Sequence, residues 1–441
     1  MEQAIWNKSL HTPHTVIVGN GITGITVARE LRKKTRNRIT VISEESSFFF
    51  SRPALMYIFM GHMRREHTFP YEASFWTKNR IELLEDTVDG IDRNGQQLIL
   101  KNSGHLRYDQ LILATGSRSN RFDWPGQNLK GVQTFYSLQD LELLEANVAQ
   151  CRQAVIVGGG LIGVEMAEML HSRGIQVTFL VREEHFWDIV LPAPEAQTIE
   201  SELRRHGVAL QMQTELRSIA GDADGRVRAV TTTRGEHIDC QLVALTVGVS
   251  PRTDLARAAG LEVGRGILVD AFLRTSDPHI FAAGDCAEFR VPLPGRRAVE
   301  QVWYTGKLQA EALAWTLAGQ ETAYAPGVWF NSAKFFDLEY QVYGEIPPGP
   351  APLLSSFFWK DSQKPRLIRI AYNNGTRSVS GIHSIGMRLR QEICVAWIEE
   401  KQTVEFVTGN LALALFDPEF YSSPLKEIQR AFQAHKDIVH V

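Results

Sequence analysis

Cysteine is scarce in this chain of 441 residues, and the four that occur are far apart. They are Cys151, Cys240, Cys286 and Cys394, and no Cys-x-x-Cys or other short spacing places two thiols on one turn. This spacing argues against a local redox dithiol or a zinc site, and we expect no metal. Isolated cysteines are most often small buried hydrophobic residues, and we expect that role for each, including Cys286.

The chain also lacks long hydrophobic runs and a strong net charge. No uninterrupted apolar stretch approaches the roughly 20 residues that span a bilayer, and residues 1–14 lack the apolar core of a secretory signal. The formal net charge of −3 gives no electrostatic reason to expect nucleic acid as a partner. Apolar content of 44% and charged content of 22% are typical of a soluble globular protein. We therefore expect a cytoplasmic protein without an integral membrane segment.

Two glycine patterns of the same form are the most informative feature that is present. Each follows a short β-branched stretch, at 15–18 and 154–157, and opens an amphipathic helical pattern, at 22–33 and 161–171. In this context the first glycine permits a tight turn, the second lets the backbone approach a pyrophosphate, and the third lets the helix pack on the strand. The two sets are Gly19, Gly21 and Gly24, and Gly158, Gly160 and Gly163. Two such sites predict two bound dinucleotides, and an enzyme that holds both moves electrons between them.

Other strand ends support this interpretation. The strand expected at 38–42 delivers Glu44 about 20 positions after Gly24, where a dinucleotide fold places the carboxylate that binds ribose hydroxyls. A solvated loop acid is the alternative. Small residues follow two further apolar strands and let the backbone approach a ligand closely. They are Ala114, Thr115 and Gly116 after 111–113, and Gly284 followed by Asp285 after 280–282.

Together these motifs resemble those of the two-dinucleotide flavoproteins, the pyridine nucleotide-disulphide oxidoreductase superfamily, over about the first 325 residues. The resemblance implies one site for FAD and one for NAD(P)H. The implied FAD site comprises Gly19, Gly21, Ile22, Thr23, Gly24, Glu44, Arg52, Pro53, Ala114, Thr115, Gly116, Gly284 and Asp285. The implied NAD(P)H site comprises Gly158, Gly160, Leu161, Ile162, Gly163, Glu165, Arg182 and Gly248.

The resemblance also implies an α/β fold with two Rossmann-like dinucleotide-binding domains and a C-terminal α+β domain. The FAD-binding domain is expected at 1–120 and 250–325, with the NAD(P)H-binding domain inserted at 121–249. The C-terminal domain, 326–441, is similar to the interface domain of the family only in position and in its mixed pattern. Its role, and the choice between a monomer and a homodimer, therefore stay open.

The segment 48–62 separates the branches of the family. Disulphide reductases carry a cysteine pair there, and this chain has no cysteine in the segment. Ser51-Arg52-Pro53 instead resembles the Arg-Pro segment of ferredoxin, rubredoxin and nitrite reductase-type flavoproteins and of apoptosis-inducing-factor-like proteins. In that branch a tryptophan lies beside the flavin, at the position of Trp303, and Glu165 matches a residue near the nicotinamide. These two are candidates only, and no catalytic residue is assigned.

The preferred nicotinamide nucleotide stays open. The NADH enzymes of the family usually have an acid at the place that aligns with Val181. Val181 is apolar and Arg182 follows it, which slightly favours the 2′-phosphate of NADPH. Glu183, however, can serve the ribose hydroxyls if the strand ends later, and Glu183 and Glu184 would repel a phosphate.

The leading hypothesis is an FAD-dependent NAD(P)H oxidoreductase. A hydride passes from the nicotinamide to flavin N5, and electrons then leave directly for a small redox protein or small molecule, without a redox-active disulphide. One alternative is a redox-sensing or scaffold flavoprotein with slow turnover. Another is a quinone reductase at a membrane surface, with 411–416 touching lipid, although a buried helix explains that stretch better. The aromatic stretch 328–336 is either a core strand or a wall facing the flavin, and 416–420 is either a turn or a docking surface.

Overall fold

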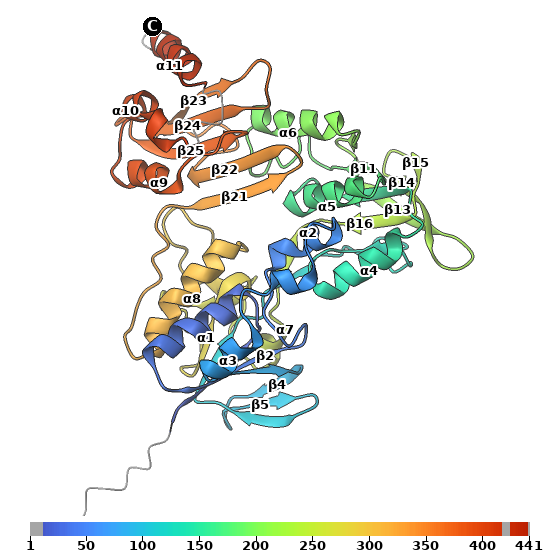
Figure 1. The fold of residues 1–441 in the computed structure, drawn as a ribbon, viewed down its shortest axis with the longest axis vertical. Helices are drawn as coiled ribbons and strands as arrows, with labels where there is room; N and C mark the ends of the chain where they lie inside the picture. Colours follow the sequence, from blue (N-terminus) through green and yellow to red (C-terminus); the bar gives the residue numbers. More distant parts are fainter. Residues whose placement is uncertain (1–11, 417–423, 440–441) are drawn as a thin grey trace, which may run out of the picture. The chain divides into compact units, whose positions relative to one another are not determined.

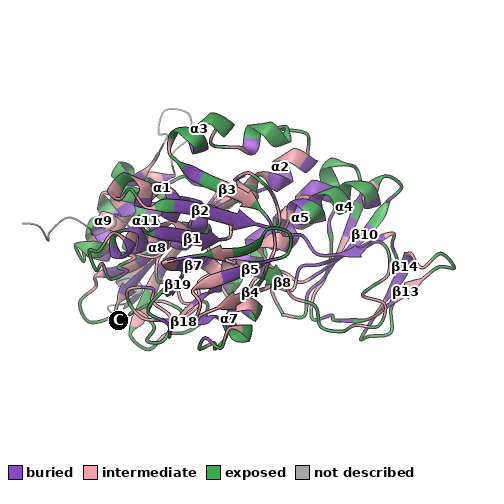
Figure 2. Cartoon of the chain, turned by 90° about the horizontal axis from the view of Figure 1, so that it is seen from below, coloured by how far each residue is buried: buried purple, intermediate pink, exposed green. Residues whose placement is uncertain are grey.

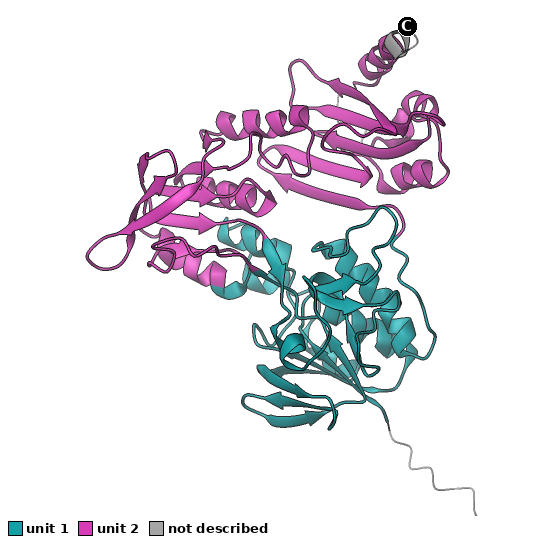
Figure 3. Cartoon of the chain, turned by 180° about the vertical axis from the view of Figure 1, so that it is seen from behind, with its two compact units in different colours: residues 1–118, 136–139, 249–326 teal, residues 119–135, 140–248, 327–441 magenta. Residues whose placement is uncertain are grey.

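The computed structural model describes residues 12–416 and 424–439 and divides the chain into two compact units (Figure 3). The first unit comprises residues 1–118, 136–139 and 249–326, and the second comprises residues 119–135, 140–248 and 327–441. The chain leaves the first unit after Arg118 and returns to it at Val249 with only one short interruption. The first unit is therefore assembled from separate parts of the sequence.

A five-stranded parallel sheet forms the centre of the first unit. Its strands are arranged in the order β19-β7-β1-β2-β3, so that the first strand of the chain is central. They are β1 (His14–Val18), β2 (Arg38–Ser43), β3 (Ile81–Glu85), β7 (Gln110–Leu113) and β19 (Ile280–Ala282). The inner strands are buried along almost their whole length (Figure 2). Their continuous β-branched and leucine runs fit a parallel sheet that is covered on both faces.

Two long helices of the first unit pack against each other. Helix α1 (Ile22–Lys34) directly follows β1, and helix α8 (Trp303–Leu317) lies beside it (Figure 1). A Cβ atom at Gly306 of α8 would collide with the hydroxyl group of Thr23 on α1. The glycine therefore sets how closely the two helices approach.

Shorter elements complete the first unit. A three-stranded antiparallel sheet is formed by β4 (Val88–Asp92), β5 (Gln97–Leu100) and β6 (Gly104–Arg107). Pro53 lies in the first turn of the short helix η1, where its fixed φ angle fits and no N–H group is missed. The other elements are η1 (Arg52–Ala54), α2 (Leu55–Phe59), η2 (Arg65–Thr68), α3 (Ala73–Lys78), β8 (Ser117–Ser119), β17 (Val249–Pro251), α7 (Asp254–Ala258), β18 (Ile267–Val269), η3 (Gly284–Cys286) and β20 (Ala287–Phe289).

The second unit contains another parallel sheet of the same kind. Its strand order is β12-β11-β10-β16-β9, and its central strand β10 leads into helix α5 as β1 leads into α1. The strands are β9 (Val132–Gln133), β10 (Gln153–Val157), β11 (Gln176–Leu180), β12 (Ala209–Gln211) and β16 (Leu242–Leu245). The helices are α4 (Leu138–Val148), α5 (Leu161–Ser172) and α6 (Ala193–Arg205), and a small antiparallel sheet contains β13 (Leu216–Gly221), β14 (Val227–Thr232) and β15 (His237–Asp239).

The second unit also contains a five-stranded antiparallel sheet near the C-terminus. Its order is β21-β22-β25-β24-β23. The strands are β21 (Phe330–Phe335), β22 (Leu338–Gly344), β23 (Leu354–Lys360), β24 (Leu367–Asn373) and β25 (Val379–Ile385). Helices follow β25 in the chain. They are α9 (Gln391–Glu399), α10 (Val404–Gly409), η4 (Leu411–Ala414) and α11 (Leu425–Val439). The aromatic stretch 328–336 becomes edge strand β21 and the turn after it.

One expectation for this region is corrected. Within the stretch 411–416, where a buried helix was expected, Leu411–Ala414 form a short 3-10 helix, and Leu413 in it is 56% exposed. Leu411 and Ala414 are its buried residues, because one short turn buries only one side. Most of the segment 416–420 lies outside the described residues.

The predicted fold class is confirmed: the chain contains two Rossmann-like parallel sheets and, after them, an α+β portion with an antiparallel sheet. The boundaries of the three expected domains stay a prediction. Among residues 12–416 and 424–439, no helix combines the length and the hydrophobicity that a bilayer crossing requires.

Candidate functional site

The first glycine pattern forms a tight cradle after β1. Gly19 has a φ of +111°, and a Cβ atom there would collide with the carbonyl oxygen of Ala114. A Cβ atom at Gly24 would collide with the carbonyl oxygen of Gly19. At Gly21, by contrast, a Cβ atom would meet no protein atom within 4 Å. The first and third glycines are thus required by the backbone itself, whereas the second faces open space where a pyrophosphate fits.

The other predicted strand ends of the first unit converge on this cradle. Strands β7 and β19 are neighbours, so the turns after them, 114–116 and 284–285, lie at the same edge of the sheet as Gly19. Gly284 has a φ of +79°, and a Cβ atom there would collide with the side chain of Thr23. Its N–H group donates to Oε1 of Gln309 at 2.7 Å. Sequence reasoning did not assign Gln309 a role.

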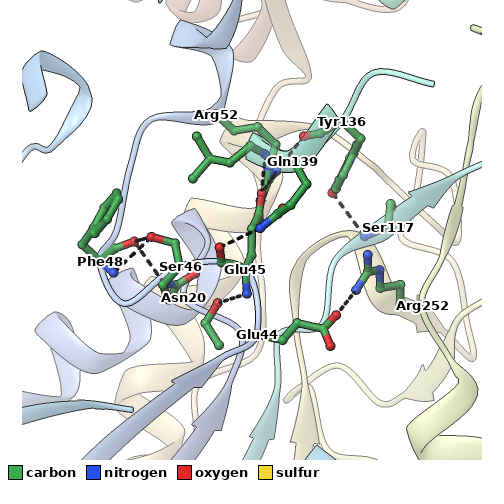
Figure 4. Close-up of polar contacts among 12 residues, drawn as sticks. Asn20, Glu44, Glu45, Ser46, Phe48, Arg52, Ser117, Tyr136, Gln139 and Arg252 are labelled. Carbon is green, nitrogen blue, oxygen red and sulfur yellow. Dashed lines mark hydrogen bonds and ion pairs between the residues drawn. The ribbon is translucent and has the colours of Figure 1, made fainter. Parts of the chain in front are cut away.

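Arg52 belongs to a network that the sequence did not predict (Figure 4). Its guanidinium group pairs with both carboxylate oxygens of Glu45, at 2.9 and 2.6 Å, and donates to the carbonyl oxygen of Tyr136 at 2.6 Å. Glu45 also accepts the N–H group of Leu138 at 3.0 Å. Arg52 is therefore held by an adjacent acid and is no isolated cation. The sequence around Glu45 contains no motif that identifies Glu45 as the partner of Arg52.

Asp285 lies in a second part of this polar cluster. Its Oδ2 accepts the hydroxyl group of Ser117 at 3.2 Å, and Gln301 donates to the same hydroxyl oxygen at 2.7 Å. Burial raises the pKa of the Asp285 carboxyl group. Burial, followed by the charge of Asp285, raises the pKa of Tyr136 to about 12. The cluster offers hydrogen-bonding groups in a sheltered setting that suits a ligand with several hydroxyl groups.

Glu44 follows β2 at the same edge of the sheet. Its side chain is 53% exposed and pairs with Arg252 at 2.8 Å (Figure 4). An exposed ion pair of this kind contributes about 0–1 kcal/mol. The carboxylate of Glu44 can therefore exchange Arg252 for ribose hydroxyls at little cost.

The second glycine pattern repeats the first cradle within the second unit. Gly158 has a φ of +109°, and a Cβ atom there would lie 2.6 Å from the carbonyl oxygen of Thr246. A Cβ atom at Gly163 would lie 2.7 Å from the carbonyl oxygen of Gly158, while one at Gly160 would meet no protein atom within 4 Å. The hydroxyl group of Thr246 donates to the carbonyl oxygens of Val157 and Gly158. Thr246 braces the turn and was missed from the sequence.

Leu161, Ile162 and Glu165 occupy the first turns of α5, directly after this cradle. Burial, followed by the negative charge of Glu168, raises the pKa of Glu165 to about 7. Gly248, with a φ of +86°, ends the turn after β16, and its carbonyl oxygen accepts the N–H group of Asn120. The structure thus gathers these residues around the second cradle.

The residues at the end of β11 bear on the nucleotide preference without deciding it. Val181 is fully buried, and a Cβ atom at Gly159 would lie 2.9 Å from its side chain. Val181 therefore belongs to the core beneath the glycine turn. Arg182 and Glu183 follow it and form an ion pair of 2.8 Å at the surface. Either side chain of this pair can meet the adenosine ribose, so the preference stays a prediction.

Trp303 and the cysteines complete the list of candidates. Trp303 is the first residue of α8, is 37% exposed and contacts the ring of Tyr304 edge-on. All four cysteines are buried. The thiol of Cys286 donates to the carbonyl oxygens of Leu113 and Ala283, and burial raises its pKa. A thiol in this setting packs and does not form a reactive thiolate.

Two nucleotide cradles in one chain, one beside a sheltered polar cluster, define a protein of the two-dinucleotide flavoprotein class. The family model for pyridine nucleotide-disulphide oxidoreductases matches residues 13–307. The chain is 33% identical to rhodocoxin reductase of Rhodococcus erythropolis over 325 residues, which cover 73% of this chain and 75% of that protein. It is 31% identical to rubredoxin-NAD(+) reductase of Pseudomonas putida over 328 residues, which cover 74% of this chain and 85% of that protein.

A solved structure of a related enzyme has the same fold. The ferredoxin reductase for the CYP199A2 system of Rhodopseudomonas palustris superposes with a TM-score of 0.80 at 26% identity, covering 89% of this chain and 98% of that one. The chain belongs to the pyridine nucleotide-disulphide oxidoreductase family. It is an FAD-dependent NAD(P)H oxidoreductase.

Proposed function

We propose that the protein passes electrons from NAD(P)H through FAD to a small redox protein, without a redox-active thiol. Support for the acceptor comes from relatives such as rubredoxin-NAD(+) reductase and rhodocoxin reductase. The observation that carries the proposal is the combination of two complete glycine cradles with four cysteines that are all buried. A dithiol relay needs a reactive cysteine at 48–62, and the sequence has none there.

The residues of the first unit fit FAD in this proposal. The backbone at Gly21 and the N-terminus of α1 receive the pyrophosphate, because the free N–H groups and the helix dipole favour anions. No acidic residue in the first turn of α1 opposes that charge. Glu44 binds the adenosine ribose, and Asp285 binds the hydroxyl groups of the ribityl chain. The Glu45–Arg52 pair holds the segment 52–54 that adjoins the flavin.

The residues of the second unit fit NAD(P)H in the same way. The cradle at Gly160 receives the pyrophosphate, Arg182 and Glu183 border the adenosine ribose, and Glu165 lies on the nicotinamide side. When bound, the two cofactors supply the hydride and electron transfer themselves. The protein contributes their placement, which supplies much of the rate enhancement in reactions of this type.

Anaerobic mixing of FAD-loaded protein with NADH or NADPH tests the proposal. Rapid bleaching of the yellow flavin band is expected with at least one nucleotide, and a ferredoxin or rubredoxin should restore the colour catalytically. Bleaching without reoxidation by any small redox protein, together with a long-lived charge-transfer band in air, would favour a redox sensor instead. Failure of both nucleotides to bleach bound FAD would refute the oxidoreductase function.

A further inference from the structure

The turn between β21 and β22 is attached to helix α5 by a single well-placed hydrogen bond. The N–H group of Phe336 donates to Oε2 of Glu168 at 2.9 Å. Phe336 lies in the turn after the last pair of the hairpin ladder and has a φ of +49°. Glu168 lies on α5, eight positions after Gly160 in a helix that begins at the second cradle. The C-terminal hairpin of β21 and β22 thus contacts α5, the helix that follows the second glycine cradle.

The same turn makes a second set of contacts, with residues at the end of helix α6. The ring of Phe336 lies 4.5 Å from that of His206 and 5.8 Å from that of His171. The carboxylate of Asp337 pairs with Arg205, which also pairs with Glu202. Two independent attachments hold the turn in place, so the Phe336 N–H group is a fixed donor.

Glu168 and Glu165 are three positions apart on α5, and residues at this spacing lie on the same face of a helix. Two neighbouring carboxyl groups in a sheltered position resist losing both protons, because like charges repel. A hydrogen bond from a backbone N–H group favours the charged form of the carboxylate that accepts it. Since Phe336 donates to Glu168, the negative charge belongs on Glu168 and the remaining proton on Glu165.

We propose that Glu168 is a positioning residue: the C-terminal hairpin holds it as a carboxylate, and it in turn keeps Glu165 protonated beside the nicotinamide site. The inference rests on the proposed function. Loss of the Glu165 proton would place a negative charge beside the nicotinamide, so it should change the rate at which the nicotinamide gives up its hydride. The hairpin thereby gains a role in the electron-transfer reaction.

Other charged groups around α5 do not replace Glu168 in this role. Strands β10 and β11, which α5 covers, carry no titratable side chain. On β21 the titratable residue is Lys334, which is exposed and opposite Glu339 in the hairpin. Other charged or titratable groups of the described residues lie at the C-terminal end of the helix or around the turn. Among them are His171, Arg173 with its partner Glu145, Arg205, His206 and Asp337.

The pH dependence of flavin reduction in the complete FAD-loaded protein tests the inference. For the wild type we expect the rate of bleaching by NADH to change at a pH of about 7, where Glu165 loses its proton. Glu168→Gln still accepts the Phe336 N–H group but removes the charge, so this change in rate should move about one pH unit lower. Glu165→Gln, which stays neutral, should abolish the change. Asp337→Asn, which weakens the other attachment of the turn, should leave it in place.

A pH profile in Glu168→Gln that matches the wild type, or a rate change near pH 7 that persists in Glu165→Gln, would overturn the inference. A second readout does not need turnover: the infrared band of a protonated carboxyl group, taken as the difference between wild type and Glu165→Gln. This band should disappear near pH 7 in the wild type and about one unit lower in Glu168→Gln. If neither nucleotide bleaches the flavin, the proposed function fails, and the infrared measurement still decides the protonation of Glu165.

Discussion

Replacing Arg369 tests whether a buried ion pair joins the C-terminal sheet to the inserted nucleotide domain. Glu195, on α6, is 0% exposed, and its two carboxylate oxygens accept from the guanidinium group of Arg369 on β24, with one N–O distance of 3.0 Å. Arg369 also donates to the hydroxyl group of Ser356 at 2.7 Å. His383 is 3.7 Å from Glu195, which is too far for a hydrogen bond, and burial lowers its pKa. Arg369 is thus the cation that Glu195 depends on.

The expected cost follows from the burial of Glu195. Arg369→Met leaves a carboxylate without its partner, which destabilises a protein by about 3–5 kcal/mol. For a unit of this size the loss corresponds to a fall of roughly 10 °C in the melting temperature. Thermal unfolding followed by circular dichroism measures it. Arg388→Met, which removes an exposed ion pair with Glu339 on the same sheet, is the control, with an expected loss of about 0–1 kcal/mol.

The pH dependence of the stability provides a second test of the Glu195–Arg369 ion pair. Burial by itself raises the pKa of Glu195, but its interactions with His383 and Arg369 outweigh burial and lower it. In the wild type this carboxylate stabilises the fold above its unfolded pKa, and the contribution is lost as the pH falls through the folded value. Without Arg369 the lowering effect of its guanidinium group is lost and only His383 still opposes burial, so the pKa of Glu195 rises and Glu195 takes up a proton at higher pH.

The stability gap between Arg369→Met and the wild type should therefore narrow as the pH falls from about 8 to about 5. The double variant Glu195→Leu with Arg369→Met should recover most of the loss, because an apolar pair can replace a buried ion pair. A loss below about 1 kcal/mol in Arg369→Met, or a double variant as unstable as the single one, would refute the reasoning.

Three further predictions concern the cofactor sites. Gly24→Ala should abolish FAD binding, measured as flavin content, because its Cβ atom would collide with backbone; Gly21→Ala should fold but bind FAD more weakly, and equal flavin content in both would contradict the cradle. Arg182→Gln should lower kcat/KM for NADPH about ten-fold and Glu183→Gln that for NADH, since each removes a charged hydrogen-bond partner; equal losses for both nucleotides would contradict these roles. Cys286→Ala should keep FAD and full activity, and an inactive, folded variant would revive a thiol mechanism.

The sequence predicted those parts of the fold that depend on local patterns. The expected strands 38–42 and 111–113 lie within β2 and β7, and the helix expected at 22–33 ends one residue later, at Lys34. Both glycine cradles have the geometry that their spacing implies, because a turn, a close approach and a helix contact each exclude a side chain locally. The sequence pattern was ambiguous for the apolar stretch 411–416, because a segment this short buries the side chains of only one side.

The contacts between distant segments could not be predicted in this way. Glu44 pairs with Arg252, Glu168 with the Phe336 N–H group and Glu195 with Arg369, and no periodicity links the members of these pairs. A single sequence shows that an acid and a base exist, but not that a fold brings them together. The network of hydrogen bonds and ion pairs around the candidate site is therefore known only from the structure and could not be predicted from the sequence.

The commitment of Arg52 to Glu45 has a consequence for how FAD is held. An arginine with a bidentate acid partner carries little net positive charge toward a ligand, so Arg52 cannot be the main counter-charge to the pyrophosphate. That charge must be met by the backbone N–H groups at the start of α1, where no acidic side chain interferes. Helix α5 also begins without an acid in its first turn. We therefore expect both cradles to bind phosphates through their backbone N–H groups, which accounts for the strength of the glycine pattern in the sequence.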